Sequence, residues 1–178
     1  ITPTVVLDPT LLVTPQDWSV LAGDKPLING DYIFIYTPWY YNYGSLFTTA
    51  LKLAKRHNLK IICSLPDNVS RWRKEQNFQF YTAVGPIEFL NLVKFSKYVF
   101  CGSFHAVVFS ILLNKPFFAY EGMKDSRIAP LLKITNLEKC AEIESGQLPI
   151  SYSNEKTREK LESHISKSIQ YLKNAIND

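Results

Sequence analysis

The alternation of short apolar runs with longer amphipathic segments constrains the fold more than any other feature of the sequence. Residues 31–36 read DYIFIY and residues 59–63 read LKIIC. Runs this apolar are typical of strands that are buried on both faces of a parallel sheet. Between them, residues 45–57 carry apolar side chains at helical spacing, with basic residues in the last turns. The three segments therefore predict a right-handed β-α-β unit.

The same pattern continues along the chain. It predicts a short helix that Thr14 caps, with Pro15 at its first position, and a long excursion without clean periodicity over residues 65–82. The remaining strands are expected at residues 4–7, 97–101 and 117–120, and the remaining helices at residues 86–95, 104–113, 126–133 and 154–176. Strands that alternate with helices predict the α/β class: a Rossmann-like domain over residues 1–178 with a mainly parallel sheet flanked by helices and a long amphipathic C-terminal helix.

Composition excludes several classes of protein. Of the 178 residues, 46% are hydrophobic and 20% are charged, so the chain can bury a core. A net charge of +4 suits a small anionic ligand and is too low for a dedicated nucleic-acid binder. Three cysteines without metal-ligand spacing predict buried thiols in a reducing compartment, no disulfide framework and no metal site. No apolar run approaches the length of a transmembrane helix, and no P-loop or GxGxxG pattern is present.

Residues 101–106 (CGSFHA) are the strongest candidate site. They connect a predicted buried strand to a predicted buried helix, and in an open α/β sheet ligands bind beyond the carboxyl ends of the strands. We expect Ser103 to cap the helix and the amides of Phe104, His105 and Ala106 to bind an anion. His105 would then act as a proton donor or acceptor beside that anion. The alternative is a structural cap at Ser103 and a histidine whose hydrogen bonds are satisfied within the fold.

Residues 123–127 (MKDSR) follow the next predicted strand and should open on the same crevice. Arg127 can bind a phosphate or a carboxylate through two hydrogen bonds, and Lys124 could add charge. A cation at a helix start is unfavourable against the helix dipole, which is itself a hint of an anion nearby. The alternative is a surface arginine without a ligand. Glu88, in the first turn of the helix after Gly85, is a candidate acid that could also reach the crevice.

Two further segments are candidates for saccharide or lid contacts. Residues 39–43 (WYYNY) place four rings at a strand end, where Trp39, Tyr40 and Tyr43 could stack on the C–H faces of sugars. Residues 71–74 (RWRK) are basic, and Arg71 could steer an anionic ligand. The alternatives are a hydrophobic lid or an interface with another domain for the first segment, and a solvated loop for the second.

At these residues the sequence resembles the polysaccharide pyruvyltransferase family. The matching pieces cover roughly residues 4–137 in the family's order, and the third of them is the specific part: residues 8–12 (DPTLL), 85–90 (GPIEFL), 103–111 (SFHAVVFSI), 115–117 (KPF) and 126–128 (SRI). They correspond to the carboxyl half of the family. The chain departs from the family at Ala106, where glycine is usual and where a methyl group could crowd a ligand.

The resemblance implies one half of a GT-B-like enzyme with two Rossmann-like domains. It implies phosphoenolpyruvate as donor, with no further cofactor, and a pyruvate ketal on two hydroxyls of a saccharide acceptor, free or lipid-linked. His105 and Arg127 match the family's site positions. The family further implies bacterial cell-surface or exopolysaccharide synthesis in the cytoplasm, at the inner face of the membrane, and an amino-terminal half outside this sequence. Two alternatives stay open: a glycosyltransferase that uses a nucleotide sugar, and a non-catalytic binding module that kept the fold.

Overall fold

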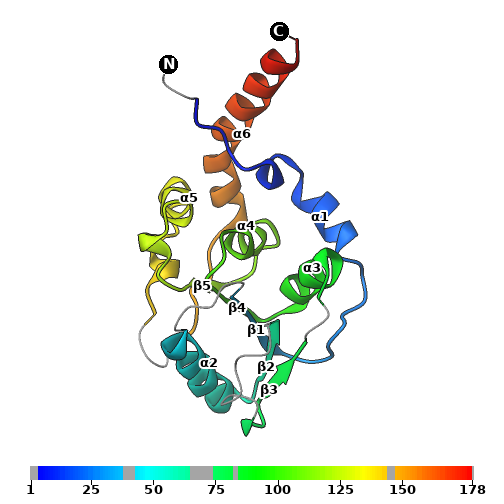
Figure 1. The fold of residues 1–178 in the computed structure, drawn as a ribbon, viewed down its shortest axis with the longest axis vertical. Helices are drawn as coiled ribbons and strands as arrows, with labels where there is room; N and C mark the ends of the chain where they lie inside the picture. Colours follow the sequence, from blue (N-terminus) through cyan, green and yellow to red (C-terminus); the bar gives the residue numbers. More distant parts are fainter. Residues whose placement is uncertain (1–3, 38–42, 65–73, 82–83, 144–146, 178) are drawn as a thin grey trace.

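Five parallel strands form the sheet in the computed structural model, which describes residues 4–37, 43–64, 74–81, 84–143 and 147–177 (Figure 1). The strand order is β3-β2-β1-β4-β5, and every neighbouring pair is parallel. The strands are β1 (Tyr32–Tyr36), β2 (Lys60–Ser64), β3 (Phe78–Phe80), β4 (Tyr98–Cys101) and β5 (Phe117–Ala119). The prediction of a Rossmann-like α/β fold with a parallel sheet is confirmed.

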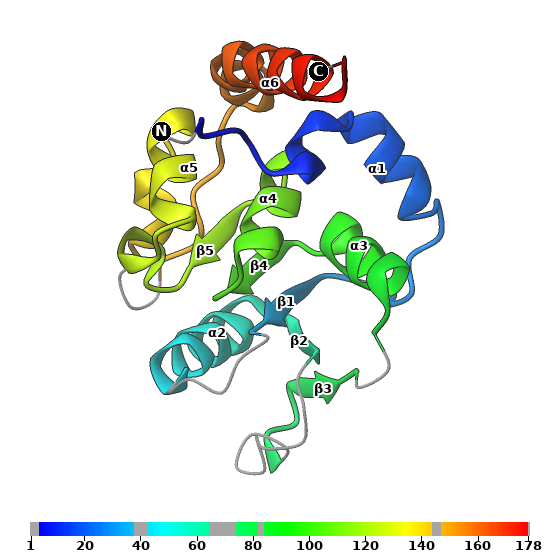
Figure 2. The same ribbon diagram turned by 45° about the horizontal axis from the view of Figure 1, so that its top comes forward.

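Helices cover both faces of this sheet. Helix α2 packs on one face, and α3 and α4 pack on the other (Figure 2). The α-helices are α1 (Pro15–Leu21), α2 (Gly44–His57), α3 (Pro86–Phe95), α4 (Phe104–Leu112), α5 (Ile128–Thr135) and α6 (Asn154–Asn177). Short 3-10 helices follow the same chain order: η1 (Pro9–Leu12), η3 (Gly122–Lys124) and η4 (Glu138–Ala141).

Strand β1 divides the hydrophobic core into two layers because its side chains alternate between the two faces. Ile33 and Ile35 are fully buried against the α2 side, whereas Tyr32 and Phe34 are fully buried against the α3 and α4 side. The Tyr32 hydroxyl donates a hydrogen bond to the carbonyl of Leu92 at 2.9 Å, which satisfies a polar group in the middle of the core. A strand buried on both faces therefore explains the unbroken apolar run of residues 32–36.

Three local predictions differ from the structure. Residues 4–7 are not a strand: they run beside α6, where the Leu7 amide donates to Ser168 Oγ at 2.9 Å and the Val5 side chain is 93% exposed. Their β-branched side chains have no sheet edge to join. Strand β3 was expected to be part of an irregular excursion, because three residues are too few to show a period. Helix α5 begins two residues later than predicted.

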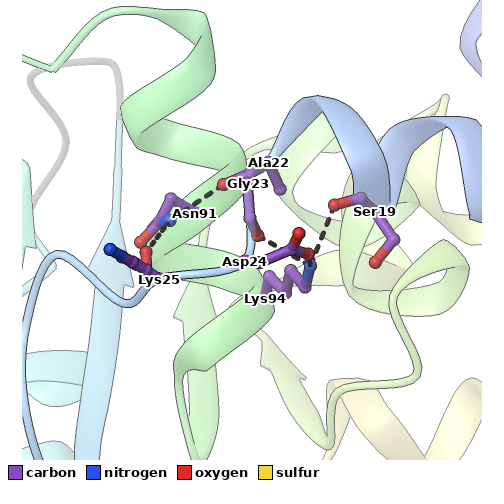
Figure 3. Close-up of polar contacts among 7 residues, drawn as sticks. All are labelled: Ser19, Ala22, Gly23, Asp24, Lys25, Asn91 and Lys94. Atoms are coloured by element: carbon purple, nitrogen blue, oxygen red, sulfur yellow. Dashed lines mark hydrogen bonds and ion pairs between the residues drawn. The ribbon is translucent and has the colours of Figure 1, made fainter.

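A polar clamp between α1 and α3 fixes the start of the domain (Figure 3). The side-chain amide of Asn91, on α3, donates to the carbonyls of Ala22 and Lys25 and accepts from the Leu27 amide. Lys94, one turn further along, donates to the carbonyls of Ser19 and Gly23 and lies 3.5 Å from the Asp24 carboxylate. These side chains satisfy carbonyls that the end of α1 leaves without helical partners. We call this arrangement the α1–α3 clamp.

Helix α6 packs against α4, α5 and η1. Leu161 is buried and Ile165 packs against the core beside α4 and α5, whereas Ile176, near the helix end, is 82% exposed. In Figure 1 the end of α6 projects beyond the rest of the fold. None of the helices in the described ranges has the length and apolar character needed to cross a bilayer.

Candidate functional site

The sheet reverses its strand order at β1 and β4, and a cavity lies at the carboxyl ends of these two strands. From β1 the chain proceeds to β2 and β3 on one side of the sheet, and from β4 to β5 on the other. Such a switch point is where open α/β sheets bind ligands. We call this space, of about 510 Å³, the switch-point cavity. Its lining residues are Tyr36, Val84, Gly85, Pro86, Phe89, Gly102, Ser103, Phe104, His105, Phe109 and Arg127.

Two helices begin at this cavity. Gly85 and Pro86 start α3, and Ser103 precedes α4. The first amide of α4 that bonds within the helix is that of Val107, which donates to the Ser103 carbonyl at 3.1 Å. The amides of Phe104, His105 and Ala106 come before it and belong to the first turn, whose N–H groups have no partner within a helix. The positive end of the α4 dipole therefore meets the cavity.

Ser103 occupies the N-cap position of α4, but its hydroxyl makes no capping hydrogen bond, so the predicted cap is wrong in that respect. The backbone of Ser103 is extended, and its amide donates to the sulfur of Cys101. The side chain is 8% exposed and lines the cavity. Because the hydroxyl does not cap the helix, it leaves the first-turn amides of α4 available to a ligand.

Asp8 pairs with His105, a contact that the sequence did not predict. His105 Nε2 lies 3.6 Å from Asp8 Oδ2, and the imidazole side chain is 55% exposed. Asp8 itself is held in place, since its Oδ1 accepts the hydroxyl of Thr10 at 2.6 Å and the amide of Thr10 at 3.0 Å. Burial alone would raise the pKa of Asp8, but these two hydrogen bonds and the neighbouring His105 outweigh it, and the pKa lies below its ordinary value. The result is an ionised carboxylate that orients the imidazole and pairs with its protonated form.

Arg127 lines the same cavity as His105, and both side chains lie near the Phe104 ring. Its guanidinium carbon is 5.8 Å from the centroid of that ring, while the His105 ring is 5.5 Å away at an edge-to-face angle of 70°. Asp125 holds the arginine: its Oδ1 accepts the amides of Arg127 and Ile128, and its Oδ2 lies 3.4 Å from the guanidinium. Burial would raise the pKa of Asp125, but these hydrogen bonds lower it overall. The Asp125 carboxylate thus caps the turn that leads into α5, whose own N-cap position is Arg127.

Phe104, His105 and Arg127 also line a second hollow, of about 410 Å³, on the far side of the pair. Its other lining residues are mostly apolar and come from the segment before η1 and from α5: Val5, Val6, Leu7, Asp8, Leu11, Ser126, Pro130, Leu131 and Ile134. His105 and Arg127 therefore stand between two hollows. The structure brings together the two side chains that the sequence analysis placed in one site.

The other predicted site residues lie in different surroundings. Ala106 is fully buried in the α4 layer of the core, so its methyl group packs inside the fold and is not among the groups that line the switch-point cavity. Lys124 pairs with Glu121 at 2.8 Å and does not line the switch-point cavity. The carboxylate of Glu88 turns back over Gly85, where a Cβ atom would lie 2.8 Å from its Oε2.

Three of the four predicted saccharide or lid contacts, Trp39, Tyr40 and Arg71, lie outside the described residues. Tyr43 is described and immediately precedes α2. Its ring packs 5.5 Å from that of Tyr120, and it covers the backbone of Gly102. Among the residues of the described ranges, no group of three or more His, Cys, Asp or Glu side chains could hold a metal ion.

Sequence comparison identifies a family. A model of the polysaccharide pyruvyl transferase family matches residues 2–122, which is more than half of the chain. Comparison with curated proteins gives no match.

Two solved structures are similar in fold to this chain. The structure of UDP-GlcNAc 2-epimerase from Methanocaldococcus jannaschii superposes with a TM-score of 0.56 at 12% identity over 89% of this chain and 48% of that one. The structure of the Methanocaldococcus jannaschii enzyme in complex with UDP-GlcNAc and UDP gives a TM-score of 0.54 at 13% identity over 94% of this chain and 54% of that one. The chain thus spans about half the length of these structures, and the likeness shows a Rossmann-like fold of the GT-B type.

Proposed function

Because the chain belongs to the polysaccharide pyruvyl transferase family, we propose that the switch-point cavity binds phosphoenolpyruvate and that the protein transfers its pyruvyl group to a saccharide. The observation that carries this proposal is the arrangement of His105 and Arg127 around the Phe104 ring, next to the first turn of α4. Phosphoenolpyruvate carries a phosphate and a carboxylate. The cavity offers a helix N-terminus for one anion and a guanidinium for the other.

The reaction joins two hydroxyls of the saccharide to C2 of the enolpyruvyl group. The methylene carbon C3 gains a proton, the C2–O bond to phosphate breaks, and two new C–O bonds form at C2. The two hydroxyl protons balance this change, one replacing the proton used at C3 and the other leaving with phosphate or solvent. Phosphoenolpyruvate thereby supplies both the transferred group and the leaving group, so the proposal includes no resident cofactor.

His105 is the residue that we assign to proton transfer. Its imidazole is partly exposed at the cavity and is oriented by Asp8, the arrangement that general acid–base catalysis requires. As an imidazolium it can protonate C3 or stabilise the charge on the departing phosphate. Arg127 holds the anion in place, and Asp125 positions Arg127.

We further propose that the acceptor belongs to an exopolysaccharide or cell-surface polysaccharide, free or lipid-linked, and that the reaction takes place in the cytoplasm, at the inner face of the membrane.

Calorimetric titration with phosphoenolpyruvate tests the donor site. We expect saturable binding to the wild-type chain and a loss of roughly tenfold or more in affinity for Arg127→Ala and for His105→Ala, because each removes a hydrogen-bond partner of the anion. Arg158→Ala and His57→Ala are matched controls on exposed helical surfaces and should bind as the wild type does. Unchanged affinity in both site variants would contradict the assigned site.

The fold likeness to an enzyme solved with UDP-GlcNAc and UDP supports a second candidate ligand, a nucleotide sugar. A thermal-shift comparison of uridine diphosphate with phosphoenolpyruvate separates the two. Our proposal predicts that phosphoenolpyruvate raises the melting temperature of the wild type and leaves that of Arg127→Ala unchanged. A shift with uridine diphosphate alone would favour the glycosyltransferase, and a shift with neither would favour a binding module.

A further inference from the structure

A smaller cavity, of about 220 Å³, lies beside the switch-point cavity on the α2 side of the sheet. We call it the tyrosine cavity because two tyrosines form part of its wall. It is lined by Tyr43, Gly102, Tyr120, Glu121, Lys124, Asp125 and Ile128. Gly102 lines both cavities, so the two spaces meet at the carboxyl end of β4. A ligand in one cavity would therefore lie next to a ligand in the other.

Gly102 is a glycine because the Tyr43 ring lies against its backbone. A Cβ atom at this position would be 2.6 Å from Tyr43 Cε1 and 2.7 Å from Tyr43 Oη, closer than real Cβ contacts allow. The glycines of the described residues that have positive φ are Gly23 and Gly30, so Gly102 is not required for its backbone conformation. The missing side chain lets the phenol approach the junction between the two cavities.

The tyrosine pair is held by contacts within the fold. The rings of Tyr43 and Tyr120 lie 5.5 Å apart at 63°, and the Tyr120 hydroxyl accepts a hydrogen bond from Ser45 at 3.1 Å. Aromatic faces fixed at a cavity wall are suited to the C–H faces of a sugar ring. The phenol hydroxyls add hydrogen-bonding groups at the same wall.

The charges of the two cavities differ in sign. Glu121 and Asp125 put carboxylates in the wall of the tyrosine cavity, whereas His105 and Arg127 line the switch-point cavity. The carboxylate of Asp125 is engaged with the amides of Arg127 and Ile128 and with the Arg127 guanidinium. Glu121 pairs with Lys124, and because both side chains are more than half exposed, this pair stabilises the fold little and can exchange for a ligand. A carboxylate in this wall repels an anion and accepts hydrogen bonds from the hydroxyls of a neutral polyol.

We infer that the tyrosine cavity is the saccharide subsite of this chain, with a sugar ring against the tyrosines and a sugar hydroxyl donating to Glu121. The inference rests on the proposed function, which requires two hydroxyls of the acceptor to lie beside the donor. It adds the place where this domain holds that acceptor. Donor and acceptor would then meet beside the Gly102 backbone, which lines both cavities.

Ligand-observed NMR titration tests the subsite, with the methyl glycosides of the common hexoses as probes and phosphoenolpyruvate titrated separately. We expect at least one glycoside to bind the wild-type chain, and Glu121→Gln to weaken that binding roughly tenfold by replacing a charged acceptor with a neutral one. Tyr120→Phe removes one hydroxyl and should weaken glycoside binding less than Glu121→Gln does. Glu159→Gln, on an exposed turn of α6, is the matched control and should leave it unchanged.

The two proposals fail in different ways. Phosphoenolpyruvate that does not bind the wild-type chain would overturn the proposed function. Normal phosphoenolpyruvate binding together with glycoside binding that is equal in Glu121→Gln and the wild type, or absent from the wild type, would overturn the saccharide subsite alone. Circular dichroism and the melting temperature of each variant show whether it is folded, so a loss of binding by an unfolded variant is not counted as support.

Discussion

The α1–α3 clamp and the switch-point cavity are both built from the polar groups of helix ends, but only the first is closed by the protein itself. At the clamp, Asn91 and Lys94 satisfy the carbonyls at the end of α1 (Figure 3). At the cavity, the hydroxyl of Ser103 does not cap α4, and the first-turn amides meet open space. A helix end that pairs within the chain contributes to stability, whereas the uncapped start of α4 is where we propose that a ligand binds.

The largest effect on stability should come from the clamp. Asn91→Leu keeps a side chain of similar size but leaves two carbonyls and one amide without their partner. We expect the free energy of unfolding to fall by about 3 kcal/mol or more, since each buried group left unpaired costs about 1–3 kcal/mol. Urea denaturation followed by circular dichroism measures this.

The control for the clamp is Asn174→Leu, on the exposed end of α6, which should change the free energy of unfolding by less than about 0.5 kcal/mol. If the two variants proved equally stable, the hydrogen bonds of Asn91 would contribute nothing, and the contrast between clamp and cavity would be lost.

An intermediate effect on stability is expected at Asp125, which accepts amides at the start of α5 and also contacts Arg127 in the proposed site. Asp125→Ala removes the cap of α5, which costs about 1 kcal/mol of stability. It also frees the guanidinium of Arg127, so phosphoenolpyruvate should bind more weakly than to the wild-type chain. Asp125→Asn can still accept the capping amides and should recover most of the stability without recovering the affinity. Equal affinity in Asp125→Asn and the wild type would mean that Asp125 does not position Arg127.

The smallest effect is the pH dependence of the Asp8 contribution. The pKa of Asp8 in the folded protein lies below its ordinary value of 3.8, so its hydrogen bonds stabilise the fold above that pH. This stabilisation is lost as the pH falls through the lowered pKa. The difference in melting temperature between the wild type and Asp8→Asn should be present above pH 3.8 and should shrink as the pH falls below it, through the lowered pKa. A difference that grew on acidification would contradict the direction of the shift.

Much of this architecture was predictable from local sequence. The runs at residues 31–36 and 59–63 predicted β1 and β2 because buried parallel strands need apolar side chains on both faces. The turn at residues 101–106 predicted that α4 begins directly after β4, at the sheet edge where we propose that an anion binds.

The remaining features depend on contacts between distant residues. Asp8 and His105 are 97 positions apart, and no periodicity connects them. The only signal at Asp8 was its place at the start of the DPTLL segment, before a proline. Residues 4–7 have strand-like composition but lie beside α6, because the tertiary fold determines which segments reach a sheet edge. No sequence pattern indicates the role of Gly102 either, because that role follows from its contact with the Tyr43 ring.

That single missing side chain has a consequence for how this domain can change. Gly102 lines both cavities, so a change at this position alters both of them. Any residue larger than glycine at position 102 would push the Tyr43 phenol away and reshape both spaces at once. A change that reshapes one cavity and spares the other must therefore come from residues that line only one of them.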